Sequence, residues 1–224
     1  MIKTQLQKYR IWKHARSQHK KVFIKGTLLN AFYKSKTIFI HIPKTAGVSL
    51  ANAIYGDVTL EGHRSFYFNI IALNVKNEKY FSFTFVRNPF DRLYSAYKFL
   101  KKGGINHYDR LAFETHLSKF KDFEDFVLNG LNNKLIYQIT HFIPQYEYLC
   151  DKRGTILVDF VGRFEDLDND ILLLSKKLKK DIKLNHHNYN KKVDYKEVYT
   201  DEMIDKVYQI YQKDFEIFNY NFSQ

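Results

Sequence analysis

The sequence predicts an α/β fold, with a central parallel sheet flanked by helices and a P-loop-like anion-binding loop. Two observations lead to this fold class. Segments rich in β-branched and aromatic residues end at short turns, and each turn is followed by a segment with helical spacing. The chain has 224 residues, of which 45% are hydrophobic. A chain of this size and composition can bury one good core.

The first of these segments covers residues 37–50, with the sequence TIFIHIPKTAGVSL. Residues 37–42 have the composition of a buried strand, and Pro43 ends the strand because it has no backbone N–H to donate. A short turn follows, and residues 48–55 are predicted to form a helix. Unpaired amides and the positive end of the helix dipole meet at such a helix N-terminus, where they favour an anion.

Side chains in this loop strengthen the prediction of an anion site. Lys44 adds a positive charge, and Thr45 and Ser49 add hydroxyl donors. We therefore predict a phosphate- or sulfate-binding loop made of Lys44, Thr45, Ala46, Gly47, Val48 and Ser49. The Lys precedes the Gly, whereas a Walker A loop has the reverse order. An ordinary turn between a strand and a helix is the competing interpretation.

A second segment of the same kind covers residues 80–100, YFSFTFVRNPFDRLYSAYKFL. Residues 81–86 are a predicted strand, and residues 90–100 have the apolar spacing of a helix. Arg87 falls at the carboxyl end of the strand, where open α/β sheets bind their ligands. Its planar guanidinium suits a phosphate group. Ser95 lies on the helix that follows.

The sequences HIPKTAGVS and FVRNPFDRLYSAY resemble the 5′-phosphosulfate and 3′-phosphate motifs of sulfotransferases. The nearest relatives by this resemblance are carbohydrate O-sulfotransferases, the Golgi heparan and chondroitin type, and their bacterial homologues. The resemblance continues through VDFVGRFE at residues 158–165 and covers residues 37–220. The resemblance implies the sulfotransferase fold, and an enzyme that moves a sulfuryl group from 3′-phosphoadenosine 5′-phosphosulfate (PAPS), its co-substrate, to a hydroxyl, that of a carbohydrate.

The resemblance also implies roles for particular residues in an in-line transfer that needs no metal. Amides of residues 44–49 would hold the 5′-phosphosulfate, and Lys44 would neutralise charge on the bridging oxygen as it leaves. Arg87 and Ser95 would bind the 3′-phosphate. Residues 186–192 resemble a basic segment that relatives fold over the nucleotide, and Lys191 is the predicted phosphate contact there.

A catalytic base is expected between the two motifs, in the sequence EGHRSFY at residues 61–67. Histidine, with an unperturbed pKa near ~6.5, suits proton removal at neutral pH. Related enzymes often carry Gly-His here, which makes His63 the candidate base and Glu61 the alternative. His41, within the first strand, is predicted to be a buried, hydrogen-bonded core residue. One cysteine and widely spaced histidines do not match a metal site.

The remaining segments are less informative. Helices and strands among them are assigned by apolar spacing and turn residues, and the acceptor region is what the resemblance implies. We expect a loop near the acceptor at 105–116, an amphipathic helix at 120–131, a segment lining the acceptor cleft at 135–149, a strand at 155–164, a helix at 165–178 and a final helix at 200–218 capped by Thr200.

Positive charge is concentrated at the N-terminus. Residues 1–56 contain 11 Lys or Arg and no Asp or Glu, out of a formal net charge of +12. We predict a basic N-terminal extension at residues 1–36 and a sulfotransferase domain at 37–224. The extension is expected to form a helix that packs Ile2, Leu6, Tyr9 and Trp12 against the domain. Binding of an anionic polysaccharide or peripheral contact with an anionic membrane is the functional alternative. No nucleic-acid motif accompanies the charge, so nucleic acid is not an expected partner.

No run of 18 apolar residues and no secretory signal is present, and Cys150 is the single cysteine. The simplest interpretation is a bacterial cytoplasmic enzyme, or a Golgi-type enzyme without its anchor. Two other functions stay open at this point. One is a P-loop-like nucleotide kinase or NTPase, and the other is a non-catalytic polyanion-binding module on the same fold.

Overall fold

A computed structural model of the chain describes residues 5–75, 79–184 and 194–223. Three strands are interspersed among the helices of these residues. In the first half they are α1 Gln5–Ser17, η1 Gln18–Phe23, α2 Leu28–Ser35, β1 Thr37–Ile40, α3 Gly47–Tyr55, α4 Phe66–Leu73, β2 Phe81–Val86, α5 Pro89–Lys101 and α6 His107–His116. In the second half they are α7 Phe123–Asp125, η2 Phe126–Gly130, η3 Leu135–Tyr137, η4 Thr140–Phe142, α8 Tyr146–Leu149, β3 Phe160–Arg163, η5 Phe164–Asp166, α9 Leu167–Leu178, η6 Tyr195–Val198 and α10 Asp201–Phe218.

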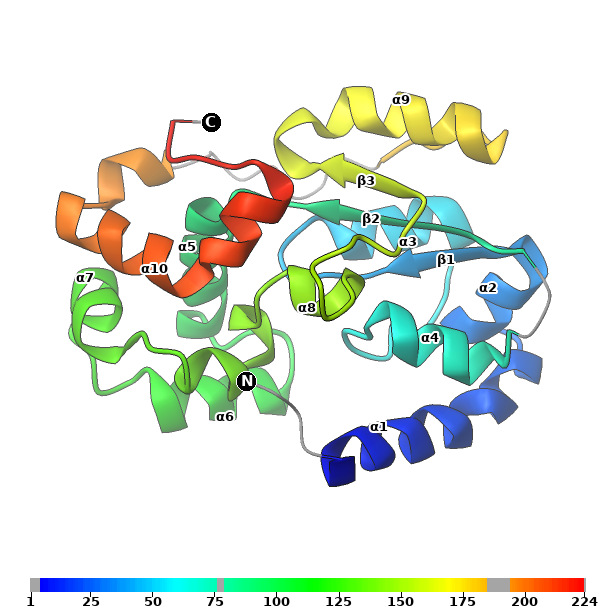
Figure 1. Cartoon of the computed structure of the whole chain (residues 1–224), viewed down its shortest axis with the longest axis horizontal. Coiled ribbons are helices and arrows are strands. Elements are labelled where there is room, and N and C mark those ends of the chain that lie inside the picture. Colours follow the sequence, from blue (N-terminus) through cyan, green and yellow to red (C-terminus); the bar gives the residue numbers. More distant parts are fainter. Residues whose placement is uncertain (1–4, 76–78, 185–193, 224) are drawn as a thin grey trace. The chain divides into compact units, whose positions relative to one another are not determined.

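The sheet has three strands in the order β1-β2-β3 (Figure 1). β1 and β2 run parallel, with Thr37 opposite Phe81 and Ile40 opposite Thr84. The Thr84 hydroxyl adds to this pairing by donating to the Ile40 carbonyl at 2.7 Å. Parallel neighbours need a helical crossover, and α3 and α4 lie in the connection between these strands. The predicted α/β fold with helices around a parallel sheet is confirmed.

Two strands are shorter than predicted. β1 ends at Ile40 instead of residue 42, and β3 covers Phe160–Arg163 instead of residues 155–164. Just before β3, the Asp159 carboxylate accepts hydrogen bonds from both the amide and the hydroxyl of Ser82, at 2.7 and 2.8 Å. Here the Asp159 side chain accepts from the Ser82 amide in place of a strand carbonyl, while the Asp159 amide still donates to the Ser82 carbonyl at 2.9 Å. Sequence composition does not distinguish a side-chain acceptor from a backbone acceptor.

The chain divides into two compact units. Unit 1 contains Met1–Ile42, Ala46–Phe85 and Glu147–Asn185, and unit 2 contains Pro43–Thr45, Val86–Tyr146 and His186–Gln224. The boundary predicted between residues 36 and 37 stays a prediction, although in unit 1 α1 lies along α4 (Figure 1).

Unit 1 has its core on the sheet. All residues of β1 are buried, and the rings of Phe39 and Phe83 stack with centroids 5.2 Å apart. Next to them, the fully buried ring of Phe85 packs against Gly162 of β3, where a Cβ would lie 2.5 Å from the ring. Only glycine lets the ring come so close. α9 runs beside β3 (Figure 1).

Unit 2 has an aromatic core with a buried charged group inside it. The rings of Phe90 and Phe215 lie 4.9 Å apart. Arg92 is 1% exposed and donates to the carbonyls of His141 and Ile143 at 3.1 and 2.9 Å. The predicted cap of the last helix is confirmed, because the Thr200 side chain accepts from the Met203 amide.

Two predictions within unit 2 were wrong. Residues 105–116, predicted as a loop, are mostly helix α6, which begins where the Asn106 side chain accepts from the Asp109 amide at 3.0 Å. Residues 120–131, predicted as one amphipathic helix, form the short helix α7 followed by the π-helix η2. The ring of Phe120 packs directly against Gly130, at the end of η2. This tertiary contact accompanies the departure from α-helical geometry.

The packing predicted for the N-terminal helix was also wrong. Leu6, Tyr9 and Trp12 are 58%, 57% and 48% exposed, and Ala15 is the buried residue of α1. Ile2 lies outside the described residues. Across the described part of the chain, no helix combines the length and hydrophobicity needed to cross a lipid bilayer.

Replacement of Gly162 by Ala is expected to destabilise the fold by ~1–3 kcal/mol, because the new methyl group overlaps the buried ring of Phe85. Urea denaturation measures the loss. The double variant Gly162→Ala/Phe85→Leu should lose less than the sum of its single variants, since the smaller side chain leaves room. A neutral Gly162→Ala would contradict the packing described for β3.

Candidate active site

The loop after β1 has an unusual backbone. Lys44 and Ala46 have φ angles of 70° and 61°, in the left-handed region that non-glycine residues rarely adopt. Ala46 is the N-cap of α3, and no side chain among the described residues caps this helix end. Strained residues of this kind persist only where surrounding contacts hold them. The contacts of Lys44 come from the other segment predicted for the site.

Arg87 holds the loop from the second motif. Its Nη1 donates to the carbonyl of Lys44 at 2.9 Å, and its Nε donates to Asp91 Oδ2 at 2.8 Å. Asp91 is one helical turn into α5, which starts with Asn88 as N-cap and Pro89 in its first turn. Arg87, predicted only as a phosphate ligand, therefore also holds the backbone of Lys44, a residue of the predicted anion-binding loop.

Gln145 fixes the backbone of Arg87 in turn. Its side-chain oxygen accepts from the Arg87 amide at 2.9 Å, and its side-chain nitrogen donates to the Arg87 carbonyl at 2.8 Å. The backbone amides of Gln145 and Tyr146 donate to the buried carboxylate of Asp214 at 2.8 and 2.9 Å. The sequence placed residue 145 only in a segment expected to line the acceptor cleft, and Asp214 carried no signal beyond its place in a helix.

Lys44 is a strongly perturbed cation of unit 2. Its Nζ lies 4.1 Å from the centre of the Phe99 ring. Burial lowers the pKa of Lys44 to about 8, and the positive charge of Arg87 contributes to this lowering, while Asp109 acts in the opposite direction. The ring face compensates the lost hydration in part. The folded chain thus holds an ammonium group in a place that disfavours its charge.

Ser95 completes the predicted group in unit 2. Asp91, Ser95 and Phe99 follow one another at i, i+4 spacing on α5 and therefore share one face of the helix. Asp91 contacts Arg87, and Phe99 contacts Lys44. Ser95 is partly exposed and lies between these two contact points.

A second pair of titratable residues, His141 and Asp109, lies beside Phe99. The Nε2 of His141 is 3.8 Å from the Asp109 carboxylate, and its ring centroid is 5.0 Å from that of Phe99. Asp109 also accepts from the amide of Ile105 at 3.1 Å. Asp109 was missed because its segment was predicted as a loop. The Asn-x-x-Asp helix start at residue 106 was the available signal.

The two histidines of interest lie together in unit 1. The rings of His41 and His63 have centroids 4.3 Å apart, and His63 Nδ1 is 3.0 Å from the His41 carbonyl oxygen. A carbonyl only accepts, so Nδ1 carries the proton and the basic lone pair of the neutral ring is on Nε2. His41 is buried as predicted, just beyond the end of β1. A Cβ on Gly47 would lie 1.8 Å from the His41 ring, so glycine is required where α3 begins.

The sequence profile of the sulfotransferase family matches residues 29–221. The chain belongs to the sulfotransferase family. Among curated proteins and among solved structures, nothing matches it at a significant level. The match begins within α2 and ends after α10, so it includes every described residue of the predicted site.

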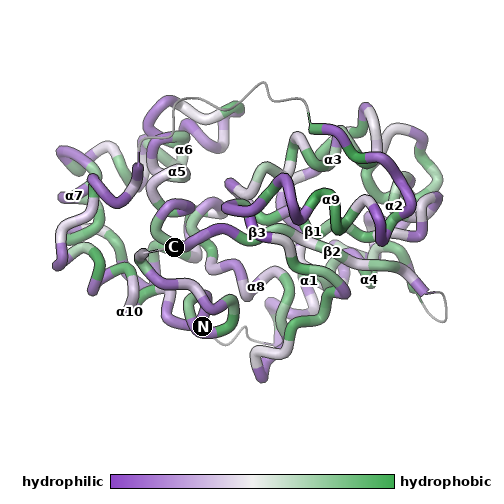
Figure 2. The backbone as a smooth tube through the Cα atoms, turned by 90° about the horizontal axis from the view of Figure 1, so that it is seen from above, coloured by the Kyte–Doolittle hydropathy of each residue, from purple (hydrophilic) through white to green (hydrophobic). Residues whose placement is uncertain are grey.

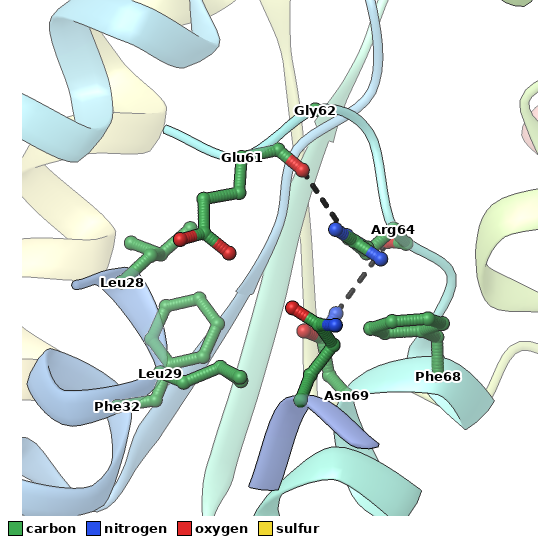
Figure 3. A pocket seen from close by; sticks show the side chains of 9 residues that line it. Leu28, Leu29, Phe32, Glu61, Gly62, Arg64, Phe68 and Asn69 are labelled. Carbon is green, nitrogen blue, oxygen red and sulfur yellow. Dashed lines mark hydrogen bonds between the residues drawn. The ribbon is translucent and has the colours of Figure 1, made fainter. Parts of the chain in front are cut away.

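Glu61, the alternative base of this sulfotransferase, has another partner. Its carboxylate lies 2.6 Å from Lys21 Nζ. It borders a small pocket in unit 1, in which it points toward Leu28 and Phe32, while Arg64 donates to the Glu61 carbonyl at 3.1 Å (Figure 3). Glu61 therefore contributes an ion pair to the packing of the N-terminal residues.

The other predicted residues of the sulfotransferase differ in exposure. Thr45 is fully buried, Ser49 is partly exposed and the Val48 side chain is 49% exposed. Because the Val48 side chain is apolar, the group with which this residue can bind an anion is its backbone amide. Lys191 lies outside the described residues. Within the part of the chain that the structure describes, no group of three or more His, Cys, Asp or Glu side chains is placed to hold a metal ion.

Replacement of Lys44 by Met should stabilise the ligand-free sulfotransferase at neutral pH. The folded pKa of Lys44, about 8, lies below the ordinary lysine pKa of 10.5. Between these values the unfolded chain binds a proton that the folded chain has lost, so this group's contribution to stability rises with pH. Below pH 8 Lys44 is charged in both the folded and the unfolded chain, so the full cost of burying its charge lowers the free energy of unfolding.

We expect Lys44→Met to raise the free energy of unfolding at pH 7 by ~1–3 kcal/mol. The gain should shrink as the pH approaches 10, as measured by chemical denaturation at several pH values. Lys176→Met, at an exposed lysine, controls for the loss of a lysine as such. A gain that stays constant with pH would mean that burial of the charge is not its cause.

Proposed function

We propose that this sulfotransferase transfers a sulfuryl group from PAPS to a hydroxyl of a carbohydrate by in-line displacement. The observation that carries the proposal is the pair of cations Lys44 and Arg87 in unit 2. The two are joined through the Lys44 carbonyl, and burial and mutual repulsion depress the pKa of Lys44. A phosphosulfate or phosphate group would relieve both effects, because it brings negative charge to a site built with excess positive charge.

The donor is held, in this proposal, by the two motifs. Backbone amides of Lys44, Thr45, Ala46, Gly47, Val48 and Ser49 bind the 5′-phosphosulfate. The acceptor oxygen forms a bond to sulfur while the bond from sulfur to the bridging oxygen breaks. The electron pair of that bond stays on the departing phosphate, where the Lys44 ammonium meets the growing charge. Lys44 is already fixed by its contacts, so little reorganisation is needed during the reaction.

The 3′-phosphate distinguishes PAPS from other adenine nucleotides. We assign it to Arg87 and Ser95, with Lys191 as a further contact. Arg87 also donates hydrogen bonds to the Lys44 carbonyl and to Asp91. Its guanidinium would therefore bind the ligand and stabilise the Lys44 backbone at the same time. Ser95 lies on the same face of α5 as Asp91 and supplies a hydroxyl donor. Ser95 is therefore the better residue for isolating the 3′-phosphate contact.

His63 is the proposed base. Its Nδ1–H is held by the His41 carbonyl, which leaves the basic lone pair of the neutral ring on Nε2, the atom that would take the acceptor's proton. Glu61 is paired with Lys21, which favours His63 over Glu61. The carbohydrate acceptor rests on the family resemblance of the two motifs.

The test is transfer of labelled sulfuryl from PAPS to a panel of polysaccharides, phenols and lipids. We expect label in a polysaccharide and release of adenosine 3′,5′-bisphosphate without added metal. Thermal stabilisation by the bisphosphate in the absence of Mg²⁺ should accompany it. Stabilisation by ATP only with Mg²⁺ would indicate a kinase or NTPase, and bisphosphate binding without transfer to any acceptor would indicate a non-catalytic module.

Ser95→Ala should weaken binding of adenosine 3′,5′-bisphosphate about five- to tenfold, or ~1–1.5 kcal/mol, and leave adenosine 5′-phosphate unaffected. Arg87→Ala should cost ~1.5–3 kcal/mol for the bisphosphate. It should also cause a smaller loss for the 5′-phosphate, because the variant releases the Lys44 carbonyl. Calorimetric titration with both ligands measures these changes. Equal losses for both ligands in Ser95→Ala would remove Ser95 from the 3′-phosphate site.

His63→Ala and Lys44→Ala should impair transfer in different ways. His63→Ala should lower kcat by ~10²–10⁴ and remove the acidic limb of the pH–rate profile, while affinity for the bisphosphate is kept. Lys44→Ala should lower kcat by ~10²–10³, much more than it weakens product binding. Glu61→Gln is the matched control and should keep the acidic limb. A His63→Ala enzyme with normal turnover would show that the base is another residue.

A further inference from the structure

The N-terminal helix exposes apolar side chains. On α1, Leu6, Tyr9, Ile11 and Trp12 are between 39% and 58% exposed. Leu6 and Tyr9 share a face of the helix with Arg10 and Lys13, at positions i, i+3, i+4 and i+7, and this face is opposite the buried Ala15. We name these four residues the outer face of α1. Polar and apolar residues are interleaved along this helix (Figure 2).

The outer face is presented by a helix that is fixed to unit 1. The Arg64 guanidinium contacts His14 at 3.0 Å, and Arg16 donates to the Asn74 side chain at 2.8 Å. His14 and Arg16 lie on the two flanks of α1, between the outer face and the buried Ala15. Trp12 stacks on Tyr9 with centroids 6.1 Å apart, at the edge of the outer face. The helix is therefore fixed to unit 1, while the stacked rings of Tyr9 and Trp12 stay about half exposed.

The charged side chains of α1 are all basic. Residues 1–56 contain no Asp or Glu, and the outer face itself carries Arg10 and Lys13. Two basic side chains on one helix face, in a part of the sequence without acidic residues, favour an anionic partner.

The apolar groups distinguish between anionic partners. Polysaccharides and nucleic acids offer charge and hydroxyl groups at a hydrated surface, where an exposed Leu gains little. A bilayer with anionic headgroups offers both charge and an acyl region, and interfacial helices combine Trp, Tyr and Leu with Lys and Arg for that reason. We propose that the outer face of α1 docks on the surface of a lipid bilayer that contains anionic phospholipid.

Trp12 is the single tryptophan of the chain, so its fluorescence reports directly on α1. The probe is vesicles of phosphatidylcholine alone or mixed with phosphatidylglycerol. With the mixed vesicles we expect co-flotation, a blue shift of the emission and quenching by brominated acyl chains. Binding should weaken with salt.

Two double variants test the basic and the apolar residues of the outer face separately. Arg10→Glu/Lys13→Glu should weaken binding to mixed vesicles at least tenfold, since each basic residue near an anionic surface contributes about fivefold. Leu6→Ser/Tyr9→Ser should weaken binding and reduce the blue shift while keeping the tryptophan. Matched controls on α9 are Lys176→Glu/Lys177→Glu and Leu172→Ser/Leu173→Ser, at residues that are also exposed. Both controls should bind like the unchanged chain.

Three results would overturn the proposal. The first is no flotation with mixed vesicles. The second is an equal loss of binding in the control variants, which would indicate attraction by net charge alone. The third is binding to heparin with no flotation and no blue shift, which would indicate a polysaccharide partner. Circular dichroism on each variant verifies that the fold is kept, so that a loss of binding reports on the outer face.

Discussion

The geometry of the cationic site in unit 2 depends on the side chain of Gln145. Its amide group satisfies both the N–H and the C=O of Arg87, which follows directly after β2 and has no strand beyond it to bond with. Gln145 is itself fully buried and is positioned through its backbone amide by Asp214. An unpaired peptide at this buried place would cost free energy comparable to a lost hydrogen bond. Arg87 is thereby fixed before any ligand binds.

A fixed Arg87 in turn stabilises the left-handed backbone of Lys44. The hydrogen bond from the guanidinium to the Lys44 carbonyl orients the peptide, and the ring of Phe99 supports the ammonium group. The result is a strained, partly desolvated lysine beside a second cation. Such an arrangement lowers the stability of the folded chain. It suits a site where negative charge develops during a reaction. The buried Asp214 adds to this cost, because burial raises its pKa while Arg92 and the amides lower it.

Unit 1 uses backbone groups in a comparable way to prepare a histidine. The His41 carbonyl accepts from His63, and the His41 ring occupies the space beside Gly47 that a side chain would fill. His41 thus orients the proposed base and restricts the first residue of α3. These two contacts explain why His41 is buried at the end of a strand better than simple core packing does. The N-terminal residues belong to the same unit, where α1 packs on α4 and Lys21 engages Glu61.

The sequence by itself determined the elements around the two motifs and the residue types in them. Pro43, the Asn88-Pro89 turn and the alternation of strand and helix patterns are local signals, and local signals were sufficient for β1, α3, β2 and α5. Lys44, Arg87 and Ser95 were predicted as site residues for the same reason, since each lies within a continuous motif. In the tertiary structure Arg87 bonds the Lys44 carbonyl, and Ser95 lies on the face of α5 that carries Asp91 and Phe99.

Only the tertiary structure decided which residues hold the site in place. Gln145 is separated from Arg87 by 58 positions and from Asp214 by 69, and no periodicity connects residues so far apart. The exposure of Leu6, Tyr9 and Trp12 was equally hidden, because a helical pattern does not reveal which face another element covers. Residues that meet through folding leave no pattern in the neighbouring sequence, whereas strands, turns and helix ends depend on neighbours and can be predicted from them.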